Sequence, residues 1–403
     1  MTGGAAVTGG GAVTVGGLGE AGILRILNRR FAAVPAAGDW PEGTVGPGDD
    51  AAVVAAPDGR FVITTDAMAQ DRDFRMAWPA ADPRGSSAGA GGGFAGGYST
   101  GWKAAAQNLS DVNAMGGDPS GLLLALTMPP TTPVEWIDGL AAGLAGAVIH
   151  LGADRCRVVG GDLGSDDRIT LAVTATGDLA GRPAVRRTLS TGGFGGPGRG
   201  GSVRPPADGG DPGLDLVLCG RAGWAAAGLD VLDTRREELL CRLGAAERAG
   251  DSGVRRTAAL ASSAQLRPRP PLGAGRRAAE SGALAMMDVS DGLLKDAGRL
   301  AAANGLRAEL DADWVRSEAR ALEPLARTLD RDAEDWVSAG GEDYGILAVK
   351  PAGTGVPAGF RRVGRLVGRL PGGPAGPEQD TAQAPGGWDH FTGPLRSSRP
   401  QSG

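Results

Sequence analysis

The chain has 403 residues, which is enough for two domains that each bury a core of their own. Its formal net charge of −5 argues against nucleic acid or an anionic membrane surface as the main partner. We expect neither a membrane span nor a secretory signal, because no apolar run approaches ~20 residues and no basic segment precedes an apolar one near the N-terminus. The three cysteines show no metal-binding spacing and fit a reducing compartment, so we expect a cytoplasmic protein.

The first half of the chain alternates short strands with longer helices. Residues 1–16 are rich in Gly, Ala and Thr and are expected to form a disordered tail. Two glycine-rich tracts, at about 83–98 and 188–211, are expected to be flexible insertions. A turn at 57–59 joins the first two strands into a hairpin, which would bring Asp50 and Asp66 together. The predicted strands are 51–55, 61–65, 122–128, 157–159, 168–176 and 214–219, and the predicted helices are 23–31, 103–115, 133–151, 222–232 and 235–265.

A stretch rich in Pro and Arg at 267–271 marks the expected division between two domains, which we place near residue 265. The N-terminal domain then spans 17–265 and the C-terminal domain 266–395, followed by a short tail at 396–403. The alternation of strands and helices predicts an α/β or α+β enzyme with two lobes. In the second domain we expect helices at 273–281, 293–303 and 316–330, and strands at 284–287, 307–310 and 346–349.

Acidic residues repeatedly follow apolar strands in this sequence, and strand ends are where α/β sheets gather ligand groups. A single Asp in such a place is more often a helix cap or a turn former. Six of them together favour a site for several Mg²⁺ ions and phosphate groups, because oxygen ligands without Cys or His suit a hard cation. The six are Asp50, Asp66, Asp111, Asp162, Asp288 and Asp291.

Other designs for phosphoryl transfer find no support in the sequence. It contains no GxxxxGK[ST] loop and neither the HRD nor the DFG motif of a protein kinase. The GxGxxG pattern at 17–22 only weakly indicates a dinucleotide site, because no strand precedes it. Both histidines, His150 and His390, are expected to be structural. Ser290 has no partner base around it, so we expect it to contact phosphate or metal.

Several motifs carry a resemblance to a known family: GDDAAVV (48–54), TTD (64–66), NLSDVNAMGGDP (108–119), GGD (160–162), DVSDGL (288–293), GGEDY (340–344) and WDHF (388–391). In this order they resemble the thiamine-monophosphate kinases. The resemblance implies the two-lobed fold of aminoimidazole-ribonucleotide synthetase (PurM-like). Its N-terminal domain would bind ATP and metal and form a homodimer through a mixed sheet, and its C-terminal domain would be α/β. It also implies that ATP and several Mg²⁺ ions are used to phosphorylate thiamine monophosphate to thiamine diphosphate.

The resemblance also implies roles for single residues. Gly161-Asp162, Arg186 and Ser290 would contact ATP, and Glu342 and Trp388 would hold the thiamine moiety. The implied mechanism is direct in-line attack of the substrate's phosphate oxygen on the γ-phosphorus, which needs no strong base. The implied metal ligands are Asp50, Thr64, Thr65, Asp66, Asp111, Asp162, Asp288 and Asp291, of which Asp66, Asp111, Asp162 and Asp288 are also the expected catalytic residues.

The sequence departs from the family pattern at three places. Asp73 stands where the family usually has a His that contacts the substrate. An anionic side chain there would repel a phosphate-bearing substrate unless a metal or Arg72 intervenes. GGDL replaces the more frequent GGDT, which removes a hydroxyl near the nucleotide. The glycine-rich tract at 188–211 follows Arg186 closely, which bears on the assignment of that residue.

Two alternatives to this function stay open. The first is another ATP-using enzyme of the same superfamily with a changed acceptor. Selenophosphate synthetase would need a reactive Cys near its N-terminus, and none precedes Cys156. The hydrogenase-maturation relative would need a C-terminal Cys, whereas this sequence closes with Pro-Gln-Ser-Gly. The second alternative is a nucleotide-binding protein without turnover, which Asp73 motivates and the intact acidic positions oppose.

Overall fold

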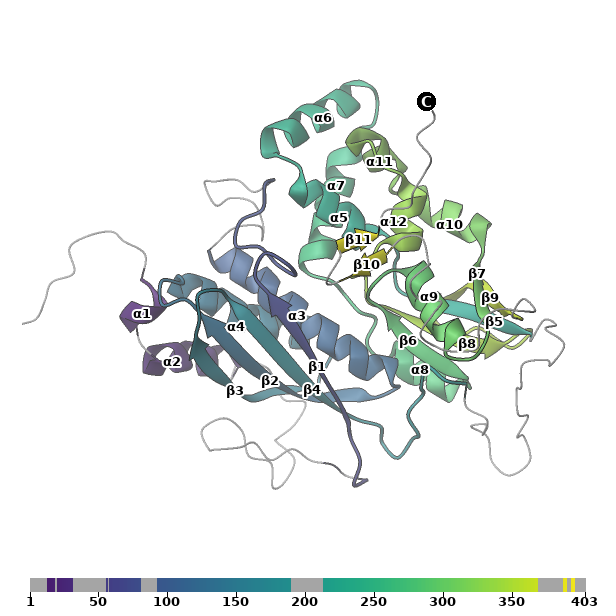
Figure 1. Ribbon diagram of the computed structural model, residues 1–403, viewed down its shortest axis with the longest axis horizontal. Helices are drawn as coiled ribbons and strands as arrows, with labels where there is room; N and C mark the ends of the chain where they lie inside the picture. The colour runs from purple at the N-terminus through teal and green to yellow at the C-terminus, as the bar shows by residue number, and fades with distance from the viewer. Residues whose placement is uncertain are drawn as a thin grey trace, which may run out of the picture.

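A four-stranded and a five-stranded β-sheet form the centres of two lobes (Figure 1). The structure is a computed structural model that describes residues 13–18, 20–31, 56, 58–80, 93–189, 213–368, 387–389 and 393–395. Each lobe has its own cluster of buried apolar side chains, so the two sheets do not share one core.

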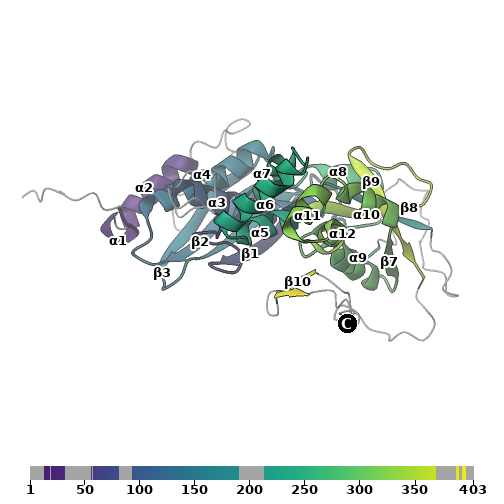
Figure 2. The same ribbon diagram turned by 90° about the horizontal axis from the view of Figure 1, so that it is seen from above.

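The N-terminal lobe combines a mixed four-stranded sheet with helices on one of its faces (Figure 2). The strand order is β1-β4-β2-β3, in which β2 and β3 are parallel and the other neighbours are antiparallel. The strands are β1 (Val62–Ala69), β2 (Asp118–Met128), β3 (Arg157–Ser165) and β4 (Thr170–Asp178), and the helices are α1 (Val15–Leu18), α2 (Glu20–Phe31), α3 (Phe94–Ala114) and α4 (Val134–His150).

The two faces of this sheet differ in what covers them. Side chains alternate along a strand, so Thr64 and Asp66 of β1 point toward α3 whereas Ile63 and Thr65 point the opposite way. Leu123 of β2 shares the second face, where it is 38% exposed, and Ile63 is 62% exposed. We call this uncovered side, which carries Ile63, Thr65 and Leu123, the open face of the sheet.

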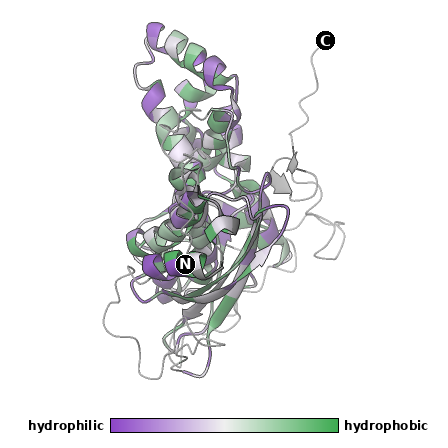
Figure 3. Cartoon of the chain, turned by 90° about the vertical axis from the view of Figure 1, so that its left-hand side faces the viewer, coloured by the Kyte–Doolittle hydropathy of each residue, from purple (hydrophilic) through white to green (hydrophobic). Residues whose placement is uncertain are grey.

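The C-terminal lobe is built on an antiparallel sheet with the strand order β6-β8-β5-β9-β7. A separate pair of short strands, β10 (Gly387–Asp389) and β11 (Gly393–Leu395), completes the described strands. Helix α6 stands clear of both sheets, at the top of the molecule in Figures 1 and 3. The strands are β5 (Leu214–Cys219), β6 (Ala285–Val289), β7 (Arg307–Leu310), β8 (Gly345–Pro351) and β9 (Phe360–Val367), and the helices are α5 (Trp224–Asp233), α6 (Arg236–Arg248), α7 (Val254–Leu266), α8 (Ala274–Glu280), α9 (Leu293–Ala302), α10 (Ala312–Ala319), α11 (Glu323–Leu329) and α12 (Ala333–Ala339).

The structure corrects the boundary between the lobes that the sequence predicts near residue 265. β5 lies between β8 and β9 in the five-stranded sheet, so the chain from residue 214 onward belongs to the C-terminal lobe. The Pro-rich stretch at 267–271 is therefore a connection within that lobe. A local change of composition does not reveal which sheet a distant strand joins, because strand pairing is a long-range contact.

Most predicted elements are present, with differences that have physical causes. The strands at 214–219 and 307–310 are confirmed at both ends. Helix α3 begins at Phe94, inside the tract at 83–98 that we expect to be flexible, and β9 and α12 are not predicted. The expected strand at 51–55 lies outside the described residues, whereas Asp58 and Gly59 of the expected turn are described, and the Gly59 N–H donates to the Ala56 carbonyl at 2.9 Å.

Glycines allow α3 and α4 to pack very close together. A Cβ added to Gly97 or Gly101 of α3 would lie 1.9 or 2.0 Å from a backbone carbonyl oxygen of α4. Gly139 and Gly143 of α4 approach the α3 backbone in the same way. Gly97, which belongs to the tract that looks flexible in the sequence, therefore lies in a tight helix–helix contact.

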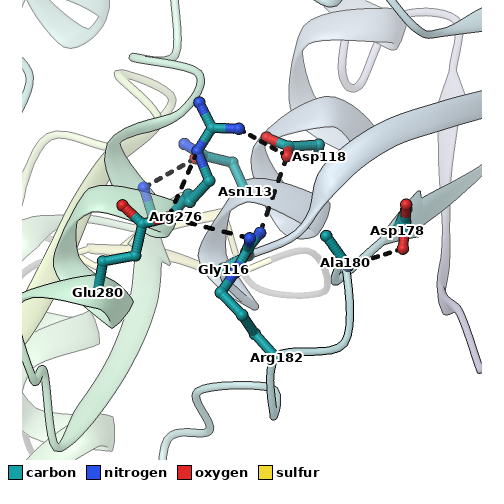
Figure 4. Close-up of polar contacts among 9 residues, drawn as sticks. Asn113, Gly116, Asp118, Asp178, Ala180, Arg182, Arg276 and Glu280 are labelled. Atoms are coloured by element: carbon teal, nitrogen blue, oxygen red, sulfur yellow. Dashed lines mark hydrogen bonds and ion pairs between the residues drawn. The ribbon is translucent and has the colours of Figure 1, made fainter. Parts of the chain in front are cut away.

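Polar contacts fasten the end of α3 to the C-terminal lobe (Figure 4). The Asn113 side chain accepts a hydrogen bond from the Gly275 backbone at 2.9 Å and donates one to the Pro271 carbonyl at 3.1 Å. Asp118, at the start of β2, accepts a hydrogen bond from Arg276 of α8 at 2.9 Å. These bonds hold α3 against α8 and thereby fix the position of one lobe relative to the other.

Replacing Gly97 with alanine should destabilise the protein, because the new methyl group would meet the backbone of α4 at 1.9 Å. We expect the free energy of unfolding to fall by about 1–3 kcal/mol, as in other overpacked cores, when it is measured by urea unfolding. The matched control is Gly298→Ala in α9, where nothing lies within 4 Å of the new Cβ. That control should gain about 0.5–1 kcal/mol, and equal behaviour of the two variants would contradict the close-packing argument.

Candidate active site

Two carboxyl groups from different lobes meet beside the C-terminal half of α3. Asp111 belongs to α3, and Asp288 lies near the end of β6. The Thr64 hydroxyl donates a hydrogen bond to Asp111 Oδ2 at 2.7 Å, and the Ser110 hydroxyl donates one to Asp288 Oδ2 at 3.0 Å. The fold therefore gathers three of the predicted metal ligands, Thr64, Asp111 and Asp288, from β1, α3 and β6.

The two carboxyl groups sit in a buried and repulsive environment. Burial raises the pKa of Asp111, while the hydrogen bond from Thr64 and the charge of Arg187 act in the opposite direction. Burial also raises the pKa of Asp288, to about 8, and the negative charges of Asp111 and Asp296 add to this shift. A hard cation with oxygen ligands would relieve the repulsion, so this pair fits Mg²⁺ as the resemblance implies.

Asp66 approaches the same side of the sheet from β1. Its backbone N–H donates a hydrogen bond to Asn108 Oδ1 at 3.1 Å, and Asn108 is fully buried on α3. The Tyr344 hydroxyl marks the centre of this region, where it lies 3.4 Å from Gln107 Oε1. Burial raises the pKa of the Tyr344 hydroxyl, and so do the surrounding carboxylates, which are Glu342, Asp66, Asp288 and Asp111.

Thr65 and Asp162 do not join this group within one chain. The Thr65 hydroxyl lies on the open face and donates to the Val173 carbonyl of β4 at 3.2 Å. β3 continues through the GGD motif to Ser165, so the motif does not end a strand. Asp162 therefore lies inside the sheet, where its side chain is on the open face. Register places Gly161 three strands across the sheet from Asp66, a separation of about 14 Å at about 4.8 Å per strand.

The turn after β6 is held by an acidic residue that sequence reasoning missed. The Asp296 carboxylate accepts the backbone N–H groups of residues 290, 291 and 292 at 3.0, 2.9 and 3.2 Å. Burial raises the pKa of Asp296 to about 6 in spite of these bonds. Its position in the first turn of α9 is the sequence signal that predicts such a cap. Asp291, a predicted metal ligand, is paired with Arg299 at 2.6 Å and with Lys295 at 3.1 Å.

A cleft of about 1070 Å³ opens beside Asp111 and Asp288, lined by β1, the end of α3, β6 and the segment 179–188. Arg186, the predicted ATP contact, lines this cleft, and its carbonyl oxygen accepts the Met286 N–H at 2.9 Å. Arg187 lines the cleft as well, although sequence reasoning did not assign it a role. The two adjacent arginines place positive charge where the two carboxyl groups place negative charge.

The loop after α12 brings Glu342 to the lobe interface further along α3. Glu342 adopts a left-handed backbone with φ +67° and donates its N–H to the Ser290 carbonyl at 2.8 Å. Lys103 Nζ lies 2.5 Å from Glu342 Oε1, and Gln265 Nε2 donates to Oε2 at 2.6 Å. Lys103 also donates to the Asp73 carbonyl at 3.1 Å, so the predicted substrate residues Glu342 and Asp73 meet at this lysine.

The remaining predicted site residues are only partly described. The Asp73 carboxylate accepts the Ala69 N–H at 2.8 Å and so closes the turn that follows β1. Asp50 lies outside the described residues, and Trp388 is placed in β10 without a described side chain. In the described part of the chain, no group of three or more His, Cys, Asp or Glu side chains is arranged to hold a metal ion by itself.

Asp343, which follows Glu342, caps helix α5. Its carboxylate accepts the Ala225 N–H at 3.0 Å and also bonds the N–H groups of Gly223 and Trp224. Oδ2 of Asp343 is buried without a partner. Burial raises the pKa of Asp343 to about 7 against these hydrogen bonds, and the charge of Glu342 raises it further.

Similarity to known families defines the class of protein. The family described as AIR synthase related protein, N-terminal domain, matches residues 48–179, and AIR synthase related protein, C-terminal domain, matches residues 246–364. The chain is thus a two-lobed protein that carries both AIR synthase related domains, and each of its two lobes is built on a sheet of its own. No helix in the described residues is long and apolar enough to cross a membrane.

Whole-chain comparisons narrow this class to one family. The thiamine-monophosphate kinase of Mycobacterium tuberculosis is 35% identical over 354 residues, which covers 87% of this chain and 86% of that protein. The chain belongs to the thiamine-monophosphate kinase family. The crystal structure of a thiamine-monophosphate kinase from Stenotrophomonas maltophilia K279a aligns with this chain with a TM-score of 0.58 at 25% identity. The alignment covers 86% of this chain and 93% of the other chain. A chain described as AaThiL complexed with AMPPCP and TMP shares the fold, with TM-score 0.55, 22% identity and coverage of 87% and 92%. The predicted family and two-lobed fold are confirmed.

Asp343 should make the stability of the folded protein fall as pH rises. Its pKa of about 7 in the folded chain exceeds that of an unfolded Asp, about 3.9, so the folded state holds one more proton between these values. We expect the free energy of unfolding of the wild type, minus that of Asp343→Asn, to decrease from pH 4 to pH 7 and to level off above it. Urea unfolding of both proteins across this range measures the difference, and a difference that does not change with pH would contradict the assignment.

Proposed function

We propose that the protein transfers the γ-phosphoryl group of ATP to thiamine monophosphate and so forms thiamine diphosphate. Membership of the thiamine-monophosphate kinase family supports this activity, and one geometric observation in this chain supports it independently. Asp111 and Asp288 face each other from two lobes beside a cleft that Arg186 and Arg187 line. Such a mixture of oxygen ligands and fixed positive charge suits two substrates that both carry phosphate groups. The solved relative that holds AMPPCP, an ATP analogue, and TMP supports the same pair of substrates.

The chemistry requires charge neutralisation more than acid–base catalysis. The phosphate oxygen of the acceptor is already anionic, so it attacks the γ-phosphorus in line without a strong base. Arg186 and Arg187 would offset the repulsion between the two sets of phosphates. The oxygens of Thr64, Asp66, Asp111 and Asp288 would hold Mg²⁺, which when bound neutralises and orients the phosphate groups.

We place the acceptor's ring system at the other end of this arrangement. Glu342 presents a carboxylate there, and Asp73 and Gln265 surround the same corner of the lobe interface. A carboxylate is a suitable partner for the cationic and hydrogen-bonding groups of thiamine. Trp388 would add an aromatic face against the ring. On this placement the acceptor lies along α3, with its phosphate near Asp111 and its ring near Glu342.

We further propose that the protein acts as a homodimer that is formed through the open face of the N-terminal sheet. Ile63 and Leu123 are 62% and 38% exposed on this face, and Phe61 just before β1 is 54% exposed. Apolar side chains gathered on an uncovered sheet are typical of an interface. Thr65 and Asp162 lie on the same face, so their implied roles toward metal and ATP would be played at this interface.

The proposal includes a cytoplasmic setting. All three cysteines are free thiols, and Cys156 and Cys219 are buried. Burial raises the pKa of the Cys156 thiol to about 12, which keeps it in the unreactive protonated form. The protein thus depends on no disulfide among its cysteines, as is usual in a reducing compartment.

The functional test is formation of thiamine diphosphate from ATP, Mg²⁺ and thiamine monophosphate by the purified protein. Metal-dependent product would support the proposal. ATP consumption that does not require thiamine monophosphate would point instead to a changed acceptor. ATP binding without any turnover would point to a binding role, and both outcomes are motivated by the acidic residue at position 73.

Asp111→Asn should lower the turnover number for thiamine diphosphate formation by at least about 100-fold, because it removes one of two facing carboxylates at the phosphate end of the site. The fold should persist, since asparagine can still accept the Thr64 hydroxyl bond, and the thermal unfolding midpoint reports this. The matched control is Asp154→Asn, at an exposed turn after α4, which should retain full activity. Full turnover by the Asp111 variant would overturn the assignment of this site.

A further inference from the structure

Lysine is scarce in this chain and is placed only at buried positions. Lysine and arginine together number 41, yet only Lys103, Lys295 and Lys350 are lysines. Their exposed fractions are 4%, 7% and 5%. Burying a cation is costly unless it is paired, so each of these lysines needs a specific partner. A chain that uses arginine almost everywhere else has therefore kept a lysine where a compact ammonium group is required.

Lys103 links three separate parts of the chain. It lies on α3, its Nζ is 2.5 Å from the Glu342 carboxylate, and it donates to the Asp73 carbonyl at 3.1 Å. The second oxygen of Glu342 accepts the Gln265 amide at 2.6 Å. Lys103 thus fixes one oxygen of the Glu342 carboxylate, and Gln265 fixes the other. An ammonium group can serve a carboxylate and a carbonyl in different directions, because its three donors rotate freely.

The contact between Lys103 and Glu342 has a geometry that can hold the Glu342 carboxylate in one orientation. Glu342 is held in a left-handed backbone conformation, which is costly for a non-glycine residue and persists only when the surroundings enforce it. Its side chain remains partly accessible, at 31%, whereas that of Lys103 is 5% exposed. The lysine side chain is therefore covered, whereas the glutamate side chain keeps surface that a ligand can reach.

The position of Lys103 along α3 relates this contact to the phosphate end of the site. Lys103, Gln107 and Asp111 follow one another at four-residue spacing and so lie along one side of the helix. At 1.5 Å per residue, Lys103 and Asp111 are about 12 Å apart along the helix axis. Tyr344, two residues after Glu342, contacts Gln107 between these two ends. An extended acceptor with a ring at one end and a phosphate at the other fits such a span.

We propose that Lys103 is a positioning residue for the acceptor, which holds the Glu342 carboxylate and the turn at Asp73 in place to bind the ring end of the substrate. This deepens the proposed function and rests on it. Without the ammonium group, Gln265 is the one described residue that still donates to the carboxylate, which can then turn away, and the Asp73 carbonyl loses its bond to α3. The cleft that Arg186 and Arg187 line lies at the Asp111 end of α3, so binding of ATP in that cleft should not sense the change.

The test compares Michaelis constants in Lys103→Met, which keeps the length of the side chain but removes its charge. We expect KM for thiamine monophosphate to rise at least about tenfold while KM for ATP changes less than about twofold. The matched control is Lys350→Met, which removes another buried lysine, one that bonds the Ser281 carbonyl in the C-terminal lobe. That control should lower thermal stability and leave both Michaelis constants unchanged.

A double-variant cycle separates positioning from a general structural role. If Lys103 acts through Glu342, then Lys103→Met combined with Glu342→Gln should raise KM for thiamine monophosphate no further than Glu342→Gln alone. Additive effects, or equal changes in both Michaelis constants, would overturn the inference. Should Lys103→Met not fold, Lys103→Arg keeps the charge in a larger planar group, and unchanged KM for thiamine monophosphate in that variant would overturn it as well. A wild type without product would reject the proposed function itself, whereas an active wild type with unaltered variants would reject only the role of Lys103.

Discussion

Helix α3 is the element on which both lobes and the candidate site depend, because it carries polar side chains through the interior. Asn108, Ser110 and Asn113 are fully buried, and each makes a hydrogen bond to another part of the structure. Buried polar groups of this kind are stable only with fixed partners, so α3 cannot shift without leaving several of them unsatisfied. The glycine contact with α4 fixes its other side. Asp111 is thus presented to Asp288 by a helix that is held from both directions.

Local structure could be predicted from the sequence more completely than the way the elements assemble. Strands such as 214–219 show themselves by short apolar runs, and their bounds are confirmed. The sequence did not predict which sheet this strand joins, because hydrogen bonding between β5, β8 and β9 links residues far apart in the chain. For glycine, the local structure itself was difficult to predict. At Gly97 the same residue type that favours a flexible tract also permits the closest helix packing, and only the facing helix distinguishes the two.

The candidate site shows a similar division. Motif order indicates Asp111 and Asp288, and the fold brings them together from two lobes. The rule that acids follow strand ends fails for Asp66 and Asp162, because β1 runs on to Ala69 and β3 runs on to Ser165. Strand alternation turns the Asp162 side chain to the open face. The sequence did not predict a role for Arg187 or Lys103, for a different reason. Their roles depend on partners that the fold supplies, and no spacing within the sequence identifies such partners.

The position of Asp73 gives a physical account of the departure from the family pattern. The sequence suggests that an acidic residue there would repel a phosphate-bearing substrate. The structure places this residue at the Glu342 end of α3, where Lys103 binds its carbonyl oxygen and its carboxylate closes its own turn. The phosphate end at Asp111 lies about 12 Å further along the helix, a distance at which repulsion through water is weak. With the acceptor lying as proposed, Asp73 is beside the cationic ring system, and its negative charge favours the substrate there.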